Sequence, residues 1–246
     1  MEPDALPSSM IARLLEEISW EKAVKYRMGG RGMENVLTAE VLGGLDLLPR
    51  DHFFGEVIRA SSGAAGARSR LALQAESAEM SLLSGDLHVN PAQAISTRFV
   101  VQPDALITTP DVFALVEAKR IRTSAFQQEQ LARELLAVIT NSNGRSPLLF
   151  LFGVEPPVRV KGLGHLTVAD AIERHLPAVL ERAGDVGLTV DDLMSRLDDI
   201  VCWISWDCIE STLRSQLEQF TAADSSVDAS IRRMGTQVLT AIDWHS

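Results

Sequence analysis

The chain has few cysteines and no long apolar run. Two cysteines, Cys202 and Cys208, are too few for a disulfide framework and favour a reducing compartment. No stretch approaches the roughly 18 consecutive apolar residues of a transmembrane helix. The opening residues, MEPDALPSSM, lack the pattern of a signal peptide. From these absences we expect a soluble protein of the cytoplasm that does not enter a membrane.

Several kinds of site lack their characteristic residues. The five histidines show no metal-ligand spacing, and none pairs locally with a cysteine, which argues against a zinc centre. The sequence has no G-x-S-x-G elbow and no dinucleotide-binding fingerprint. The small residues at 61–66, SSGAAG, lack the Gly-Lys-Ser/Thr end of a phosphate-binding loop. Aromatic residues make up only 5% of the chain, which leaves little material for stacking single-stranded bases.

Positive charge is also scarce, because 23 Lys and Arg face 33 Asp and Glu, for a net charge of −10. Such a molecule as a whole repels phosphates, which argues against a protein that coats nucleic acid non-specifically. A nuclease remains compatible with this charge, since its active site needs carboxylates and its groove can be locally basic. The apolar fraction of 46% over 246 residues permits a sizeable core.

The residues at 99–122, FVVQPDALITTPDVFALVEAKRIR, predict a β-hairpin. Two apolar runs flank the turn sequence TTPD at 108–111. The second run is apolar on both faces for five residues, as in a buried central strand. Glu117 and Lys119 interrupt it, and side chains two residues apart on a strand point to the same face. Charges inside a buried strand require a partner or a ligand.

The hairpin register places a second carboxylate near Glu117. If the loop spans residues 109–112, Asp104 lies opposite Glu117, with Cβ atoms about 4.5–5.5 Å apart. A two-residue loop would set Asp104 opposite Leu115, still on the same face, whereas a loop of odd length or a bulge would separate the carboxylates. Two close carboxylates repel each other, and a divalent cation between them removes the conflict. We therefore expect a Mg²⁺ site, with Mn²⁺ as a substitute.

A known signature matches this pattern. Pro103-Asp104, twelve intervening residues and Glu117-Ala118-Lys119 resemble the PD-(D/E)xK motif of restriction-endonuclease-like nucleases. The core of that family is a helix, a three-stranded antiparallel meander, a crossover helix and a further strand. Here residues 124–140 have helical apolar spacing and residues 148–154 indicate a buried strand. The resemblance implies an α/β fold with an α-β-β-β-α-β mixed sheet flanked by helices, spanning about residues 32–154.

The resemblance also implies roles for the motif residues. Asp104 and Glu117, with the backbone carbonyl of Ala118, would hold one or two Mg²⁺ ions against the scissile phosphate. Lys119 would orient or deprotonate the attacking water, or stabilise charge in the transition state. The first core helix of the family often adds a glutamate to the metal site, and Glu34 is the better match, with Glu40 as the alternative. Ordinary solvated glutamates are the competing interpretation.

Residues with supporting roles are expected around this centre. Some members of the family place a glutamine or glutamate on the helix after the motif, and Gln128 is the candidate here, although solvated helix surface explains it better. Strand ends and loops near the site are expected to supply phosphate contacts. The candidates are Arg120, Arg122, Arg145, Arg159 and Lys161.

The remaining segments predict a single domain over residues 1–246. It comprises an N-terminal part (1–31) with a helix at 10–28, the core, an insertion at about 50–95, and a mostly helical extension with one additional strand (155–246). Within the insertion we expect a short strand at 52–60 and a helix at 67–83. In the extension Pro177 should break a helix, and Thr189 and Asp207 should cap two others.

These observations predict a magnesium-dependent phosphodiesterase, namely a DNA endonuclease of a bacterial defence, repair or mobile-element system. Such enzymes commonly dimerise to cut two strands, so a homodimer is one expectation. Two alternatives stay open. One is a catalytically silent module that uses the same fold for binding or assembly. The other is a helical α+β interaction protein in which the motif is coincidental, and it would place Asp104 and Glu117 on opposite faces.

Overall fold

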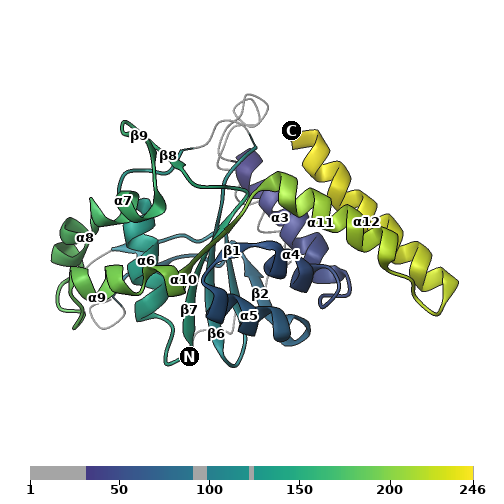
Figure 1. Cartoon of the computed structure of the whole chain (residues 1–246), viewed down its shortest axis with the longest axis horizontal. Coiled ribbons are helices and arrows are strands. Elements are labelled where there is room, and N and C mark those ends of the chain that lie inside the picture. Colours follow the sequence, from purple (N-terminus) through teal and green to yellow (C-terminus); the bar gives the residue numbers. More distant parts are fainter. Residues whose placement is uncertain (1–31, 91–98, 122–124, 246) are drawn as a thin grey trace, which may run out of the picture.

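A computed structural model describes residues 32–90, 99–121 and 125–245. It shows a mixed six-stranded sheet with helices on both faces, which confirms the α/β class (Figure 1). The predicted helix at 10–28 lies outside the described residues. The strands, in their order across the sheet, are β1 (Ser62–Gly63), β10 (Val201–Ile204), β7 (Ser146–Phe152), β6 (Val112–Ala118), β5 (Ala105–Thr108) and β2 (Glu79–Leu82).

The central hairpin has the predicted register. β5 and β6 are antiparallel, and Thr108 pairs with Phe113, so that the loop spans residues 109–112. The side chain of Thr109 closes this loop by accepting the backbone N–H of Val112 at 3.0 Å. All seven residues of β6 are buried. The alternation of side chains and the turn residues together were sufficient to predict this element.

The strands next to the hairpin are joined to it by one antiparallel pairing and by one crossover connection. β2 pairs antiparallel with β5, which completes a meander of β2, β5 and β6. The helix α6 (Gln130–Thr140) then carries the chain back, so that β7 lies parallel to β6. The helix α6 begins at Gln130, several residues after the predicted start at residue 124. The helix α3 (Gly32–Leu47) precedes the meander.

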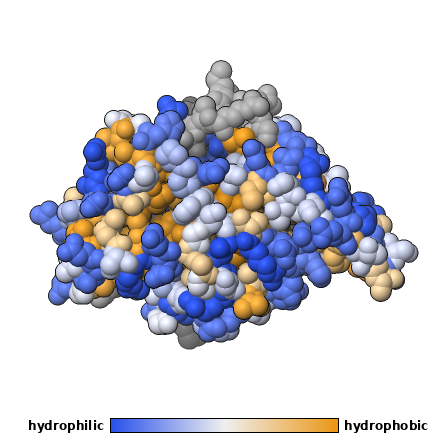
Figure 2. All heavy atoms as spheres, viewed as in Figure 1, coloured by the Kyte–Doolittle hydropathy of each residue, from blue (hydrophilic) through white to orange (hydrophobic). Residues whose placement is uncertain are grey.

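Two hydrophobic cores lie on the two faces of the sheet. Ala114, Val116 and Ala118 of β6 belong to the core that α3 covers, and Phe113 and Leu115 to the core that α6 covers. Figure 2 shows hydrophobic side chains gathered in the middle of the view and hydrophilic ones at its periphery. Four more helices contribute to the core on the α3 side: α4 (Phe54–Ala60), α5 (Ala65–Leu73), α11 (Trp206–Gln219) and α12 (Ser225–His245). Four others contribute to the core on the α6 side: α7 (Val168–Glu173), α8 (Leu176–Ala183), α9 (Val190–Ser195) and α10 (Leu197–Ile200).

The segment predicted as an insertion belongs partly to the main sheet. The expected strand at 52–60 is wrong, because Phe53, Phe54, Val57 and Ile58 bury themselves at helical spacing in and just before α4. The expected helix at 67–83 ends at Leu73. After a 3₁₀ turn, η1 (Ala75–Ser77), the chain becomes β2, whose alternating exposure matches an edge strand. This segment therefore supplies both edge strands, β1 and β2.

The helix termini of the extension follow the sequence signals with one exception. α7 ends before Pro177, which lies in the first turn of α8, and Thr189 caps α9 through a reciprocal bond with Asp192. The cap of α11 is Ser205, whose hydroxyl accepts the N–H of Cys208, so the prediction of Asp207 is wrong. Two small hairpins complete the fold: β3 (Leu87–His88) with β4 (Val100–Val101), and β8 (Val158–Val160) with β9 (Gly164–Leu166).

No helix within the described ranges has the length and apolar character needed to cross a lipid bilayer.

The packing of α12 on α3 predicts a sensitive glycine. A Cβ added at Gly44 on α3 would lie 2.2 Å from Cγ2 of Val238 on α12. We expect Gly44→Ala to lower the free energy of unfolding by about 1–2 kcal/mol, since overpacking outweighs the gain in helix propensity. Gly66→Ala in α5 is the matched control, because the nearest atoms there belong to the flexible end of Arg70 at 3.8 Å. Urea unfolding of both variants tests this, and equal shifts would contradict the close packing.

Candidate active site

The carboxyl end of β6 carries a buried ion pair. Glu117 and Lys119 are only 4% and 7% exposed, and the Lys119 ammonium contacts Oε1 of Glu117. The ammonium also lies 4.8 Å from the centroid of the Phe126 ring. The two side chains project toward the α6 side of the sheet, in the alternation set by Leu115. The predicted shared face of Glu117 and Lys119 is therefore confirmed.

The helix α6 adds an amide and a second buried carboxylate that the sequence analysis did not single out. Nε2 of Gln130 donates to Oε1 of Glu117 and, at 2.9 Å, to Oε1 of Glu134. Glu134 is only 3% exposed. Residues four apart on a helix lie on one face, and here that face also carries the buried Leu131. A glutamate within an apolar helical stripe was the signal that could have identified Glu134.

Burial makes Glu134 a weak acid. Desolvation, followed by repulsion from the Glu117 carboxylate, raises the pKa of Glu134 well above its ordinary range, and the Lys119 charge and the Gln130 bond offset part of this. Among the residues that the structure describes, no group forms a hydrogen bond with its second, buried oxygen, Oε2. Such an atom is costly to leave unsatisfied. A cation or a proton at this position would satisfy it.

Asp104 reaches the same strand end through the backbone. The last regular pair of the hairpin is Ala105 with Val116, and beyond it Oδ2 of Asp104 accepts the N–H of Ala118 at 2.7 Å. If the antiparallel ladder continued past Ala105, the N–H of Ala118 would donate to the carbonyl of Pro103, and it donates to the Asp104 carboxylate instead. The Ala118 carbonyl points toward the same strand, and Pro103 has no N–H to donate to it. The predicted pair of Asp104 with Glu117 is not part of the ladder, because the N–H of Asp104 donates to the carbonyl of Val116 at 3.1 Å and the regular pairing ends at Ala105.

The backbone of Lys119 is held from both sides. Its N–H donates to the carbonyl of Phe152 at 2.9 Å, and its carbonyl accepts the indole N–H of Trp206 at 2.7 Å. The indole fits because residue 153 is glycine with φ +76°, where a Cβ would lie 2.1 Å from the indole nitrogen. The site therefore depends on the turn between β10 and α11, which was not predicted to contribute.

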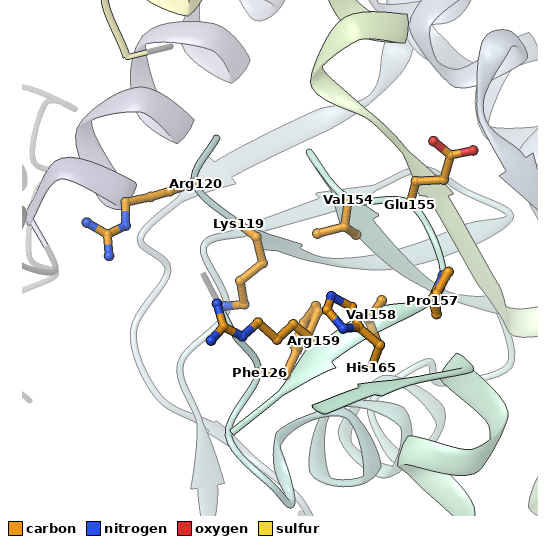
Figure 3. Close-up of a pocket in the computed structure, with 9 residues that line it drawn as sticks. All are labelled: Lys119, Arg120, Phe126, Val154, Glu155, Pro157, Val158, Arg159 and His165. Carbon is orange, nitrogen blue, oxygen red and sulfur yellow. The ribbon is translucent and has the colours of Figure 1, made fainter. Parts of the chain in front are cut away.

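A pocket of about 270 Å³ opens beside Lys119 at the carboxyl ends of β6 and β7 (Figure 3). Ligands of open α/β sheets commonly bind at this edge. Of the predicted phosphate contacts, Arg120 and Arg159 line the pocket, and Lys161 follows β8 next to it. The full lining is Lys119, Arg120, Phe126, Val154, Glu155, Pro157, Val158, Arg159 and His165.

Other predicted residues are not brought to this centre. Arg145 immediately precedes β7, whose first residue pairs with the first residue of β6, so it lies at the opposite end of the strand, roughly 20 Å away at about 3.3 Å per residue. Glu40 is exposed on α3, which covers the other face of the sheet. Gln128 is exposed and donates to the carbonyl of Lys161 at 3.3 Å, while Gln130 has the contact to Glu117. Arg122 and the side chain of Glu34 lie outside what the structure describes.

The donor chemistry at this strand end suits a hard cation. Carboxylate and carbonyl oxygens, which Mg²⁺ prefers, come from Asp104, Glu117, Glu134 and the Ala118 backbone. Among the residues that the structure describes, no three of His, Cys, Asp and Glu are already gathered as a metal-binding group. Holding an ion would require Glu117 to exchange part of its contact with Lys119 and Gln130.

No family model, curated protein or solved structure matches this chain.

The raised pKa of Glu134 predicts a pH-dependent stability in metal-free buffer. Protonated Glu134 stabilises the folded chain fully below the ordinary glutamate pKa of about 4.3. Between that pH and the higher pKa of the folded state, only the unfolded chain releases the proton, so the free energy of unfolding falls as the pH rises. Glu134→Gln has no proton to lose. We expect its stability relative to the original chain to grow with pH by up to about 1.4 kcal/mol per pH unit.

Urea unfolding across the range from acidic to mildly alkaline pH, in EDTA, measures this difference. Glu173→Gln, an exposed substitution on α7, is the matched control and should give a difference that does not change with pH. A Glu134→Gln curve that stays parallel to that of the original chain would contradict a buried, protonated Glu134.

Proposed function

We propose that this protein is a magnesium-dependent nuclease that hydrolyses phosphodiester bonds, with its catalytic centre at the carboxyl end of β6. The observation that carries the proposal is the buried cluster in which Gln130 joins Glu117 to Glu134 beside Lys119. Burying such charges costs several kcal/mol, and an apolar set of side chains would fill the space without this cost. A catalytic requirement accounts for the charges.

The element order supports the same proposal. After α3 come α4, β1 and α5, then β2, the β3–β4 hairpin, β5, β6, the crossover helix α6 and the parallel strand β7. With the intervening elements set aside, this order resembles the α-β-β-β-α-β order of the restriction-endonuclease-like family, and the PD-(D/E)xK residues lie just before β5 and at the end of β6. DNA as the substrate, endonucleolytic cleavage, a homodimer and a role in bacterial defence, repair or mobile elements are proposed on this resemblance.

The residues would divide the work as follows. Asp104, Glu117 and the Ala118 carbonyl would hold the ion, and Glu134 would supply a further oxygen. When bound, Mg²⁺ lowers the pKa of a coordinated water and stabilises charge on the phosphate. Lys119, held at the pocket edge by Glu117 and the Phe126 ring, orients the water or stabilises the developing negative charge. Trp206 acts through the Lys119 backbone and keeps that side chain in position.

A second candidate is a catalytically silent module that binds nucleic acid through the same fold. The observation in its favour is the engagement of Glu117 by both Lys119 and Gln130, which leaves the carboxylate internally satisfied. The two candidates differ in whether divalent metal displaces these contacts.

Cleavage assays separate the candidates. Purified protein is incubated with supercoiled plasmid, linear duplex, single-stranded DNA and RNA, in Mg²⁺, Mn²⁺ or EDTA. We expect metal-dependent cutting, lowered at least about 100-fold by Glu117→Gln and by Lys119→Met. Glu173→Gln removes an exposed carboxylate and should cut normally.

Circular dichroism of each variant shows whether it still folds. Full activity in folded Glu117→Gln would contradict the assignment of the centre. An original chain that cuts none of the substrates and gains no thermal stability from Mg²⁺ or Mn²⁺ would support the silent module.

A further inference from the structure

The pocket beside Lys119 is cationic within an acidic protein. Three of its lining residues are Lys119, Arg120 and Arg159, and His165 adds an imidazole. Glu155 is the one carboxylate among the described residues that line it, and Figure 3 shows its side chain directed away from Lys119. Figure 3 also shows the Arg120 side chain directed away from the others, so the donors that remain are Lys119, Arg159 and His165. In a chain with net charge −10, such a local gathering of donors favours an anionic ligand.

The hairpin of β8 and β9 presents two of these donors side by side. Arg159 pairs directly with His165 across the two strands, and directly paired residues project from the same face. Both side chains are exposed, and within the described ranges no other group forms a hydrogen bond or ion pair with the Arg159 guanidinium. Lys119 and Arg159 turn their nitrogen ends in the same direction in Figure 3.

Backbone hydrogen bonds join the β8–β9 hairpin to Phe126 in the candidate active site. The N–H of Phe126 donates to the carbonyl of Arg159, and the N–H of Lys161 donates to the carbonyl of Phe126, both at 2.9 Å. Gln128 adds a side-chain bond to the Lys161 carbonyl. Because the ring of Phe126 also lies under the Lys119 ammonium, the backbone of Arg159 is placed next to Lys119. The exposed side chain of Arg159 is still able to turn toward a ligand.

The pocket also has an apolar wall. Phe126 and Val158 are buried side chains that line it, with Val154 next to them. Its volume of about 270 Å³ equals that of roughly nine liquid water molecules at about 30 Å³ each, which exceeds the need of a bare phosphate. A phosphate with its attached sugar fits both the donors and the apolar wall.

We propose that Arg159 and His165, beside Lys119, form a phosphate-binding subsite for a nucleic-acid strand, adjacent to the phosphate that is cut. Only the identification of the strand rests on the proposed nuclease function. The subsite itself follows from the donors and the pocket. The phosphate is either an internal phosphodiester or a terminal monophosphate, since both present non-bridging anionic oxygens to these donors.

The test is binding in EDTA, where no cleavage occurs. Short fluorescent single strands and duplexes, each with a 5′-phosphate or a 5′-hydroxyl, are titrated with the original chain, Arg159→Ala, His165→Ala and the control Arg174→Ala. Arg174 is exposed at the end of α7 and does not line the pocket. We expect Arg159→Ala to weaken binding about tenfold and to lower the slope of log K against log salt by about 1. His165→Ala should weaken binding less, and Arg174→Ala should change neither quantity.

The two sources of phosphate are distinguished by the strand ends. A 5′-phosphate that tightens binding only while Arg159 is present identifies a terminal subsite, and equal weakening of both oligonucleotides identifies an internal one. Either result supports the subsite. Unchanged affinity and salt slope in Arg159→Ala and His165→Ala would overturn it.

Inorganic phosphate separates this proposal from the nuclease proposal. In ¹⁵N NMR spectra we expect added phosphate to shift the amide signals of Phe126, Arg159 and His165, with smaller shifts in Arg159→Ala. These shifts without any oligonucleotide binding would support the subsite and count against the nuclease. No shift at these amides, together with no oligonucleotide binding, would overturn the subsite.

Discussion

The buried contact between Glu117 and Lys119 is the constraint on which the site depends. Two charges so far from water are tolerated only when each has a partner. Removing either one would leave the other uncompensated and lower the free energy of unfolding by about 3–5 kcal/mol. The neighbouring elements supply these partners. α6 contributes Gln130, the segment before it contributes Phe126, and the first residue of α11 is Trp206. Segments far apart in sequence are thereby drawn to one strand end.

The hairpin and its charged face could be predicted because they follow from local rules. A two-residue side-chain period and a loop rich in turn residues set the register, and that register fixed which side chains share a face. The crossover helix also predicted a parallel β7. That parallel order already implied that Arg145, just before β7, lies at the amino end of the strands, so its inclusion among the phosphate contacts was an avoidable error.

The remaining differences have tertiary causes. Residues 52–60 form a short apolar segment whose spacing suits either a helix or a strand, and packing against the core selected α4. Residues 79–82 form β2 because they pair with β5, and no local sequence pattern in these residues predicts a strand. Gln130 and Glu134 were missed because α6 begins later than predicted, which shifts the residues that face Glu117. The extension was predicted to hold one additional strand, and that prediction is wrong, because β8 and β9 form a hairpin there besides β10, and this hairpin carries a wall of the pocket.

An acidic protein can act on an acidic polymer only where its field is locally reversed. Here buried carboxylates and the cations of the pocket lie on either side of Lys119, at one edge of the sheet, as the proposed nuclease would need. Each phosphate contact releases counterions, so binding through so few cations should weaken only moderately as salt is added. The arrangement suits an enzyme that engages its substrate at a few defined phosphates.

Anomalous X-ray diffraction from crystals soaked in Mn²⁺ tests the central claim most directly, because it locates the ion without relying on a substrate. The account predicts an anomalous peak bound by the carboxylates of Asp104 and Glu117 and by the carbonyl of Ala118, and no such peak in Glu117→Gln. Crystals in which Mn²⁺ binds elsewhere, or in which Glu117 keeps both Lys119 and Gln130 at saturating Mn²⁺, would contradict a metal-dependent centre at the end of β6.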